Sequence, residues 1–95
     1  MVNKVKKIIT TEEILKIARM GHSSEKQRKV NEIVIGFADN DMCLASVDTW
    51  DVYCSVIHKC TSVSEEMKKL AYFNAFENQL QLLRMKNQSK ENTGR

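Results

Sequence analysis

Residues 62–86 read SVSEEMKKLAYFNAFENQLQLLRMK and contain neither glycine nor proline. The good helix formers Leu, Met, Ala, Gln, Glu and Lys dominate this stretch. Ser62 and Glu65 have the spacing of a capping box, in which a hydroxyl and a carboxylate satisfy unpaired backbone amides at the start of a helix. We therefore predict a long helix over residues 62–86, roughly 37 Å from end to end at ~1.5 Å per residue.

Two apolar stripes run along this predicted helix when its residues are placed ~100° apart. The first stripe consists of large side chains: Tyr72, Phe73, Phe76, Leu80 and Leu83. The second lies nearly opposite: Met67, Ala71, Ala75, Leu82 and Met85. A polar row survives between them: Asn74, Glu77, Gln81 and Arg84. Both stripes could be core, or the first could bind a partner. We favour the partner, because a domain below ~100 residues rarely encloses such a helix.

The composition indicates one small, mostly helical domain. The chain has 95 residues, 42% of them hydrophobic, with three glycines and no proline. These values are typical of a folded core and suit helices better than a turn-rich β-sandwich. The chain shows no membrane-length apolar run and no signal-peptide pattern, and three cysteines are an odd number for a disulfide framework. We expect a cytoplasmic protein with reduced thiols and no membrane partner.

Three further helices are predicted before residue 62. Thr10 and Glu13 form a capping box that opens a helix over residues 11–20, and Gly21 follows where a left-handed residue commonly ends a helix. Ser24 and Gln27 have the same spacing and open a helix over residues 24–38.

The third predicted helix covers residues 41–59. Five residues spaced by three and four would face the core: Cys43, Val47, Trp50, Cys54 and Ile57. Trp50, the only tryptophan, is expected to anchor the packing.

Residues 33–47 leave a second fold open. Their β-branched and aromatic residues flank Asp39, Asn40 and Asp41, which are good turn formers, so a β-hairpin would also fit. The third helix would then begin near Asp48. We favour an all-α domain of four helices with a long C-terminal helix; the alternative is an α+β fold with this central hairpin.

The two ends of the chain differ from the helical body. Residues 1–9 form a basic segment that could be a flexible arm, a short strand or a helical lead-in. Residues 87–95 are polar without periodicity, so we expect a disordered tail there. A single helical domain over residues 1–86 is the resulting organisation.

Charge is divided along the chain. Residues 1–29 carry eight Lys/Arg against three Glu, residues 30–58 carry five Asp/Glu and no Lys/Arg, and residues 59–95 carry seven Lys/Arg against four Glu. The candidate anion-binding or nucleic-acid-binding residues are basic side chains of the first segment: Lys4, Lys6, Lys7, Lys26, Arg28 and Lys29. Cations in the first turns of a helix are unfavourable unless an anion binds there. A solvated basic surface is the simpler interpretation.

The predicted helices 11–20 and 24–38, joined by a short turn, have the outline of a helix-turn-helix. The second helix would present its basic residues to phosphates, and the N-terminal arm would follow a groove or the backbone. The agreement is loose, because Gln27 stands where that motif needs a core residue.

Catalytic and metal-binding patterns are weak. Cys54 and His58 share a helix face, but Cys60 points elsewhere and the chain has no C-x-x-C pair. A Cys–His nucleophile would also need an orienting group and an oxyanion site. We expect no enzyme activity, no metal and no cofactor.

The sequence thus favours a non-enzymatic interaction protein, homodimeric, that binds and modulates a larger protein partner. Binding would bury the first stripe, since large aromatic side chains usually carry the affinity at interfaces. The basic residues 26–29 would steer an acidic partner. The alternative is a DNA-binding transcriptional regulator that uses residues 11–38 and dimerises through the C-terminal helix.

Overall fold

The computed structural model describes residues 6–93, with side chains through Asn87. In chain order the elements are β1 (Lys7–Ile9), α1 (Thr11–Ala18), α2 (Ser24–Ala38), β2 (Met42–Leu44), α3 (Val47–His58) and α4 (Glu65–Thr93). Four helices and one two-stranded sheet thus make up the described part of the chain, and most of it is helical. The predicted small all-α class with a long C-terminal helix is confirmed.

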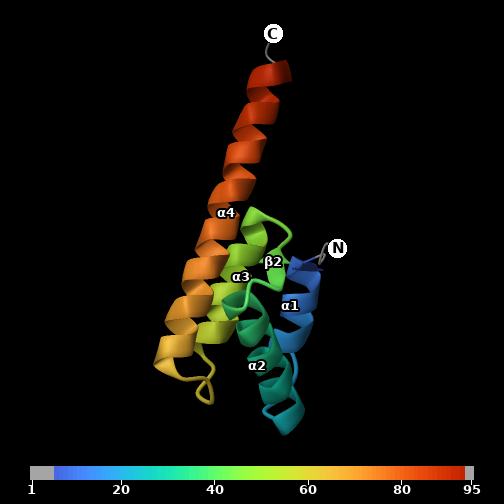
Figure 1. Ribbon diagram of the computed structural model, residues 1–95. Helices are drawn as coiled ribbons and strands as arrows, with labels where there is room; N and C mark the ends of the chain where they lie inside the picture. Colours follow the sequence, from blue (N-terminus) through green and yellow to red (C-terminus); the bar gives the residue numbers. More distant parts are fainter. Residues whose placement is uncertain (1–5, 94–95) are drawn as a thin grey trace, which may run out of the picture.

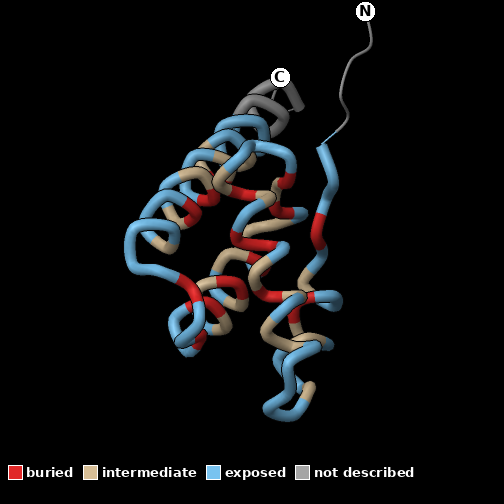
Figure 2. The backbone as a smooth tube through the Cα atoms, turned by 60° about the horizontal axis from the view of Figure 1, so that its bottom comes forward, coloured by how far each residue is buried: buried red, intermediate tan, exposed pale blue. Residues whose placement is uncertain are grey.

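The long helix α4 organises the molecule. Figure 1 shows α1, α2 and α3 gathered beside its first half, while its C-terminal part extends past them. α4 packs on both α2 and α3, and α1 packs mainly on the other side of α3. Figure 2 shows the buried residues gathered where these helices face one another, and residues 80–87 of α4 are exposed or only half-buried. One core therefore forms around the first half of α4.

The two strands form a parallel pair rather than a hairpin. Lys7 lies opposite Met42 and Ile9 lies opposite Leu44, with α1 and α2 as the crossover between them. Parallel strands require such a long connection, whereas a hairpin needs only a short turn. The predicted helix over residues 41–59 is therefore wrong at its start: a strand replaces its first turn, and α3 begins at Val47. The hairpin alternative is also wrong, because residues 33–38 are helical.

A left-handed residue ends α2 at the predicted turn. Asn40 has a φ of 62°, and the amide of Asp41 donates to the carbonyl of Gly36 over 2.8 Å. The amide of Asn40 donates to the carbonyl of Phe37 over 3.1 Å. This is the Schellman arrangement, and asparagine tolerates the left-handed conformation better than most residues. Gly21 does not have the predicted left-handed conformation, since no described glycine has a positive φ.

The helix caps agree with the sequence in kind but partly differ in position. The Thr10 hydroxyl accepts from the amide of Glu13 over 3.2 Å, as predicted. Ser23 rather than Ser24 caps α2, and Ser64 rather than Ser62 accepts at the start of α4, from the amide of Met67 over 3.2 Å. Serines lie close together in both segments, so local spacing alone does not select the cap.

The core-facing side of α3 agrees with the prediction only at Ile57. Thr49, Tyr53 and Ile57 are buried, while Trp50 and Cys54 are only half-buried. Tyr53 is the central aromatic residue, with its ring centroid 4.5 Å from that of Phe37. Apolar residues occupy several sides of α3, so periodicity alone could not identify the buried side.

The predicted chain ends are only partly described. Residues 7–9 form a strand, one of the three conformations expected for the basic segment, and Lys4 lies outside the described residues. Helix α4 continues to Thr93, beyond the predicted helix end at Lys86, and the disordered tail stays a prediction. Residues 94 and 95 lie outside the described part.

Candidate interaction surface

A row of large apolar side chains on α4 faces outward. Its members are spaced by three, four and three residues: Phe73, Phe76, Leu80 and Leu83. Phe73 is 58% exposed, Phe76 47% and Leu83 40%, whereas Leu80 is half-buried. We call these four residues the α4 row. Leu70, which is 50% exposed, stands one turn before Phe73 and prolongs the apolar surface.

The opposite side of α4 holds the helix on the body. Ala71 and Ala75 are completely buried, and their small side chains let α4 lie close to its neighbours. Leu82 is half-buried, while Met67 and Met85 are exposed. The second predicted stripe is therefore core only in its middle part. Because the alanine side of α4 is buried, the α4 row is left exposed to solvent. A partner-binding role for the first stripe, which the sequence favours, requires this exposure.

Tyr72 belongs to the edge of the core rather than to the α4 row. Its ring lies edge-on to that of Tyr53, with the centroids 6.2 Å apart, and the side chain is half-buried. Burial is the main cause that raises the pKa of the Tyr72 phenol. The structure thus brings together four of the five predicted partner-binding residues and places the fifth beside the core.

Trp50 extends the apolar surface from α4 onto α3. Its ring is tilted against that of Phe76 with the centroids 5.9 Å apart, and the side chain is half-buried. Sequence reasoning assigned Trp50 to the core and missed this role. Only the packing of α3 on α4 brings the two aromatic rings together. Trp50 contacts Phe76 from one side, so the surface has an aromatic pair at its centre.

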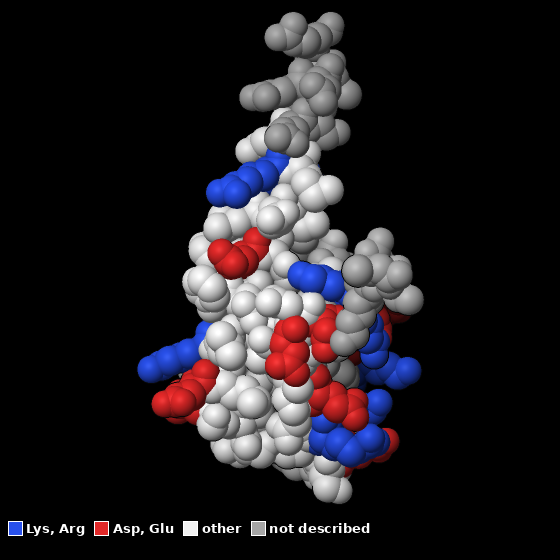
Figure 3. All heavy atoms as spheres, in the orientation of Figure 1, with Lys and Arg blue, Asp and Glu red and all other residues white. Residues whose placement is uncertain are grey.

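Charged side chains are few along the exposed side of α4. In Figure 3 white, uncharged surface runs along much of α4, interrupted by separate Lys/Arg and Asp/Glu groups. Glu77, Gln81 and Arg84 are exposed, as the predicted polar row requires. Asn74, the fourth member of that row, turns inward and donates to backbone carbonyls of α2. An apolar strip with a polar border is typical of a protein-binding surface.

The candidate basic residues do not form one continuous site. Arg28 pairs with Glu32 over 3.4 Å on the exposed side of α2, and the Lys26 ammonium donates to the Ala18 carbonyl over 3.4 Å. Lys6 and Lys7 are exposed beside the sheet, and Lys4 lies outside the described residues.

The predicted helix-turn-helix segment does not pack as an isolated pair. α1 lies mainly against α3, whereas α2 packs chiefly against α4. Gln27, which would face the inside of the motif, donates from Nε2 to Cys60 Sγ over 3.1 Å. The two helices of the predicted motif therefore pack mainly on other helices rather than on each other.

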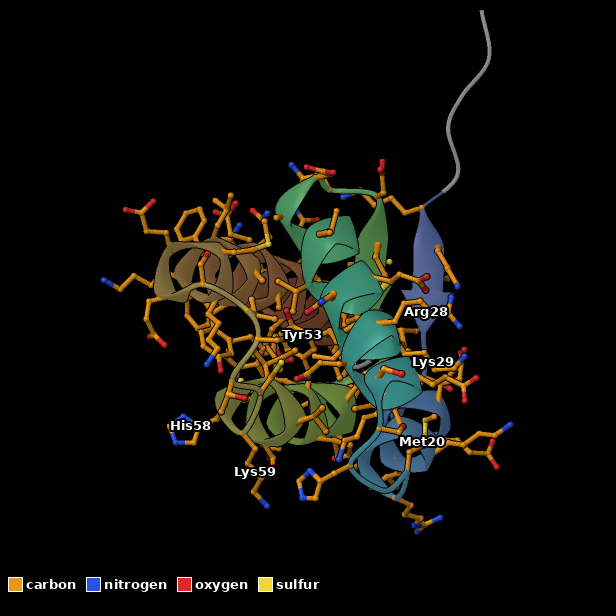
Figure 4. The ribbon with its side chains drawn as sticks, turned by 90° about the horizontal axis from the view of Figure 1, so that it is seen from below. Met20, Arg28, Lys29, Tyr53, His58 and Lys59 are labelled. Carbon is orange, nitrogen blue, oxygen red and sulfur yellow. The ribbon has the colours of Figure 1, made fainter. Side chains whose placement is uncertain are left out.

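The Cys54–His58 pair shows no arrangement for nucleophilic chemistry. Burial, followed by the charge of Asp51, raises the pKa of the Cys54 thiol, which opposes formation of the reactive thiolate. His58 is exposed at the end of α3 and points outward in Figure 4. No group of three or more His, Cys, Asp or Glu within the described residues could hold a metal ion.

Comparisons with known proteins leave the surface to be interpreted from its own chemistry. No family model, curated protein or solved structure matches the chain. None of the helices in the described part is both long and apolar enough to cross a membrane.

Proposed function

We propose that the protein is a non-enzymatic interaction protein whose α4 row binds an apolar helix face of another protein molecule. The exposure of Phe73, Phe76 and Leu83 on one side of α4 carries this proposal. About half of each of these side chains is exposed, so completing the burial would be worth roughly half of the ~1.5–3 kcal/mol that full burial of a large apolar side chain provides. A helix that docks along the row would recover this free energy.

The spacing of the row favours a second copy of the chain as the occupant. If two α4 helices lie antiparallel about a two-fold axis near Asn78, Phe73 meets Leu83 and Phe76 meets Leu80 of the other copy. Residues spaced by three and four also form the seam of paired helices. The proposed assembly is a homodimer that works in the cytoplasm, consistent with the three unpaired thiols at Cys43, Cys54 and Cys60.

Molar mass in solution tests the proposal. Sedimentation equilibrium of the full chain should give a dimer, and Phe73→Glu should raise the dissociation constant by at least about 100-fold, because the two-fold axis presents each change twice. Ile35→Glu is the matched control, since Ile35 is a 44% exposed apolar residue on α2, outside the row. Both variants should keep the helical circular dichroism of the wild type.

The possible outcomes distinguish two questions: whether the α4 row is the interface, and whether a second copy of the chain occupies it. A dimer that Phe73→Glu leaves intact would show that the row is not the interface. A monomer at every concentration would exclude the second copy as occupant, and the row would then have to capture a larger protein partner. Failure of Phe73→Glu to reduce that capture would refute the proposal as a whole.

A further inference from the structure

A hollow on the side of the molecule away from the α4 row has the character of a ligand site. It lies between the end of α1, the start of α2 and the end of α3, and its volume is about 440 Å³. The residues that line it come from these segments: Ala18, His22, Ser23, Lys26, Gln27, Val30, Ser55, Val56, Lys59, Cys60 and Thr61. No α4 residue contributes. The volume falls within the ~300–1,000 Å³ typical of small-molecule sites.

The lining combines cations with apolar side chains. Lys26 and Lys59 supply two ammonium groups, and no Asp or Glu lines the hollow. Val30, which is buried, and Val56, which is half-buried, add apolar side chains to the same lining. Hydroxyl groups of Ser23, Ser55 and Thr61 also line it and can donate hydrogen bonds. One end of a ligand would therefore meet positive charge and the other would meet hydrocarbon.

The two cations of the hollow have no acidic partner among the described residues, unlike Arg28 and Lys68 but like several exposed lysines elsewhere. Arg28 pairs with Glu32 on the exposed side of α2, and Lys68 pairs with Glu65 on α4. Among the described residues, Lys59 makes no ion pair, and Lys26 reaches only the carbonyl of Ala18, over 3.4 Å. Lys26 also stands in the first turn of α2, where the helix dipole disfavours a cation. An anion bound between the two lysines would give both a partner of opposite charge and would offset the unfavourable position of Lys26 in the first turn of α2.

From this combination we infer that the hollow binds a small organic anion, a carboxylate or phosphate monoester carried on an apolar body. Lys26 and Lys59 hold the anionic group from opposite walls, and Val30 and Val56 contact the body. Figure 4 looks onto this end of the molecule, where Lys59 projects from the end of α3 and Met20 follows the end of α1. The inference concerns a different surface from the proposed function and stands without it.

Three probes separate the features of such a ligand. Phenyl phosphate carries both an anion and an apolar body, inorganic phosphate carries only the anion, and phenol carries only the body. Titration of the ¹⁵N-labelled full chain, followed by amide chemical shifts, should show phenyl phosphate binding at least tenfold tighter than either fragment. The shifts should centre on residues 22–30 and 55–61, and α4 residues 70–83 should not respond.

Substitutions in the lining test whether phenyl phosphate binds in the hollow. Lys26→Gln combined with Lys59→Gln should weaken phenyl phosphate at least tenfold, whereas Lys16→Gln with Lys69→Gln, an equal charge change at exposed sites outside the hollow, should not. Ser55→Trp should abolish binding by filling the hollow. Ser55 is exposed, so the fold should tolerate the larger side chain, and unchanged circular dichroism would verify this.

Three results would overturn the inference. Equal affinities for phenyl phosphate and inorganic phosphate would reduce the hollow to a patch of surface charge. Shifts centred on α4 would place binding at the apolar row instead. Absence of shifts with millimolar phenyl phosphate at low salt would show that the hollow is not a site for this class of ligand.

Discussion

The side-chain amide of Asn74 on α4 donates to the backbone carbonyl of Phe37 at the end of α2. The same nitrogen also donates to the carbonyl of Ala38 over 3.1 Å. Carbonyls in the last turn of a helix have no hydrogen-bond partner within the helix. Asn74 donates to two of them, although it lies 37 residues after Phe37 and 36 residues after Ala38 in the sequence. Together with the left-handed Asn40, this contact fixes how α2 ends against α4.

Asn74→Ala should therefore lower the free energy of unfolding by about 1–2 kcal/mol, since it removes two hydrogen bonds and leaves two carbonyls less satisfied. Urea denaturation followed by circular dichroism measures the change. Glu77→Ala is the matched control, because Glu77 is exposed one turn away on the same helix. Equal effects of the two substitutions would show that the Asn74 contact adds nothing to stability.

Tyr53→Phe should raise the free energy of unfolding by about 1 kcal/mol, because it removes a buried polar atom that lacks a partner. The Tyr53 hydroxyl has no hydrogen bond to any described residue, and the side chain is almost completely buried. Urea denaturation at pH 7 tests this. A loss of stability of similar size would indicate that the hydroxyl makes a favourable interaction after all.

The buried phenol of Tyr53 should also make the folded protein less stable at alkaline pH. Burial is the main cause that raises the pKa of Tyr53 far above its ordinary value of 10.0. Below pH 10 both the folded and the unfolded chain keep the phenol proton, so its contribution to stability is complete. Above pH 10 the unfolded tyrosine releases the proton while the folded one retains it, which costs up to about 1.4 kcal/mol per pH unit.

Melting temperatures between pH 8 and 11 should therefore fall more steeply for the wild type than for Tyr53→Phe. The comparison is made between the two proteins because the raised pKa values of Tyr72 and Cys54 contribute to the fall in both. Parallel curves would show that Tyr53 ionises equally easily in the folded and unfolded chain.

Cys54 should react with iodoacetamide roughly two- to fivefold faster in Asp51→Asn than in the wild type at pH 8. The Asp51 charge is the second cause, after burial, that raises the pKa of this thiol, so its removal increases the thiolate fraction. Peptide mass spectrometry distinguishes Cys54 from Cys43 and Cys60. Asp48→Asn, on the exposed first turn of α3, is the control and should not change the rate.

Titration with a mixed-sequence DNA duplex at 50 and 200 mM salt tests the competing DNA-binding function. The dispersed basic residues lead us to expect weak binding even at the lower salt, without the steep salt dependence that several simultaneous phosphate contacts produce. Arg28→Glu with Lys29→Glu should then change little. Tight, steeply salt-dependent binding that this double variant abolishes would favour the DNA-binding regulator over the interaction protein.

Local chemistry made much of the fold predictable. The absence of proline and the good helix formers after Ser64 favour a long helix, and the Thr10–Glu13 spacing marks the start of α1. The turn at Asn40 follows from residues that tolerate unusual backbone angles. The exposure of Phe73, Phe76 and Leu83 was also predictable, because a small body cannot cover both stripes of a long helix.

The sequence by itself thus indicated four helical segments and favoured the aromatic side of α4 as the exposed one, while leaving residues 33–47 open between helix and hairpin. Only the tertiary structure decided the pairing of Lys7–Ile9 with Met42–Leu44, the contact of Trp50 with Phe76, the inward turn of Asn74, and the hollow between Lys26 and Lys59. Each of these joins residues that are distant in sequence. Periodicity and capping rules report interactions within a few residues, whereas these contacts exist only once the helices pack.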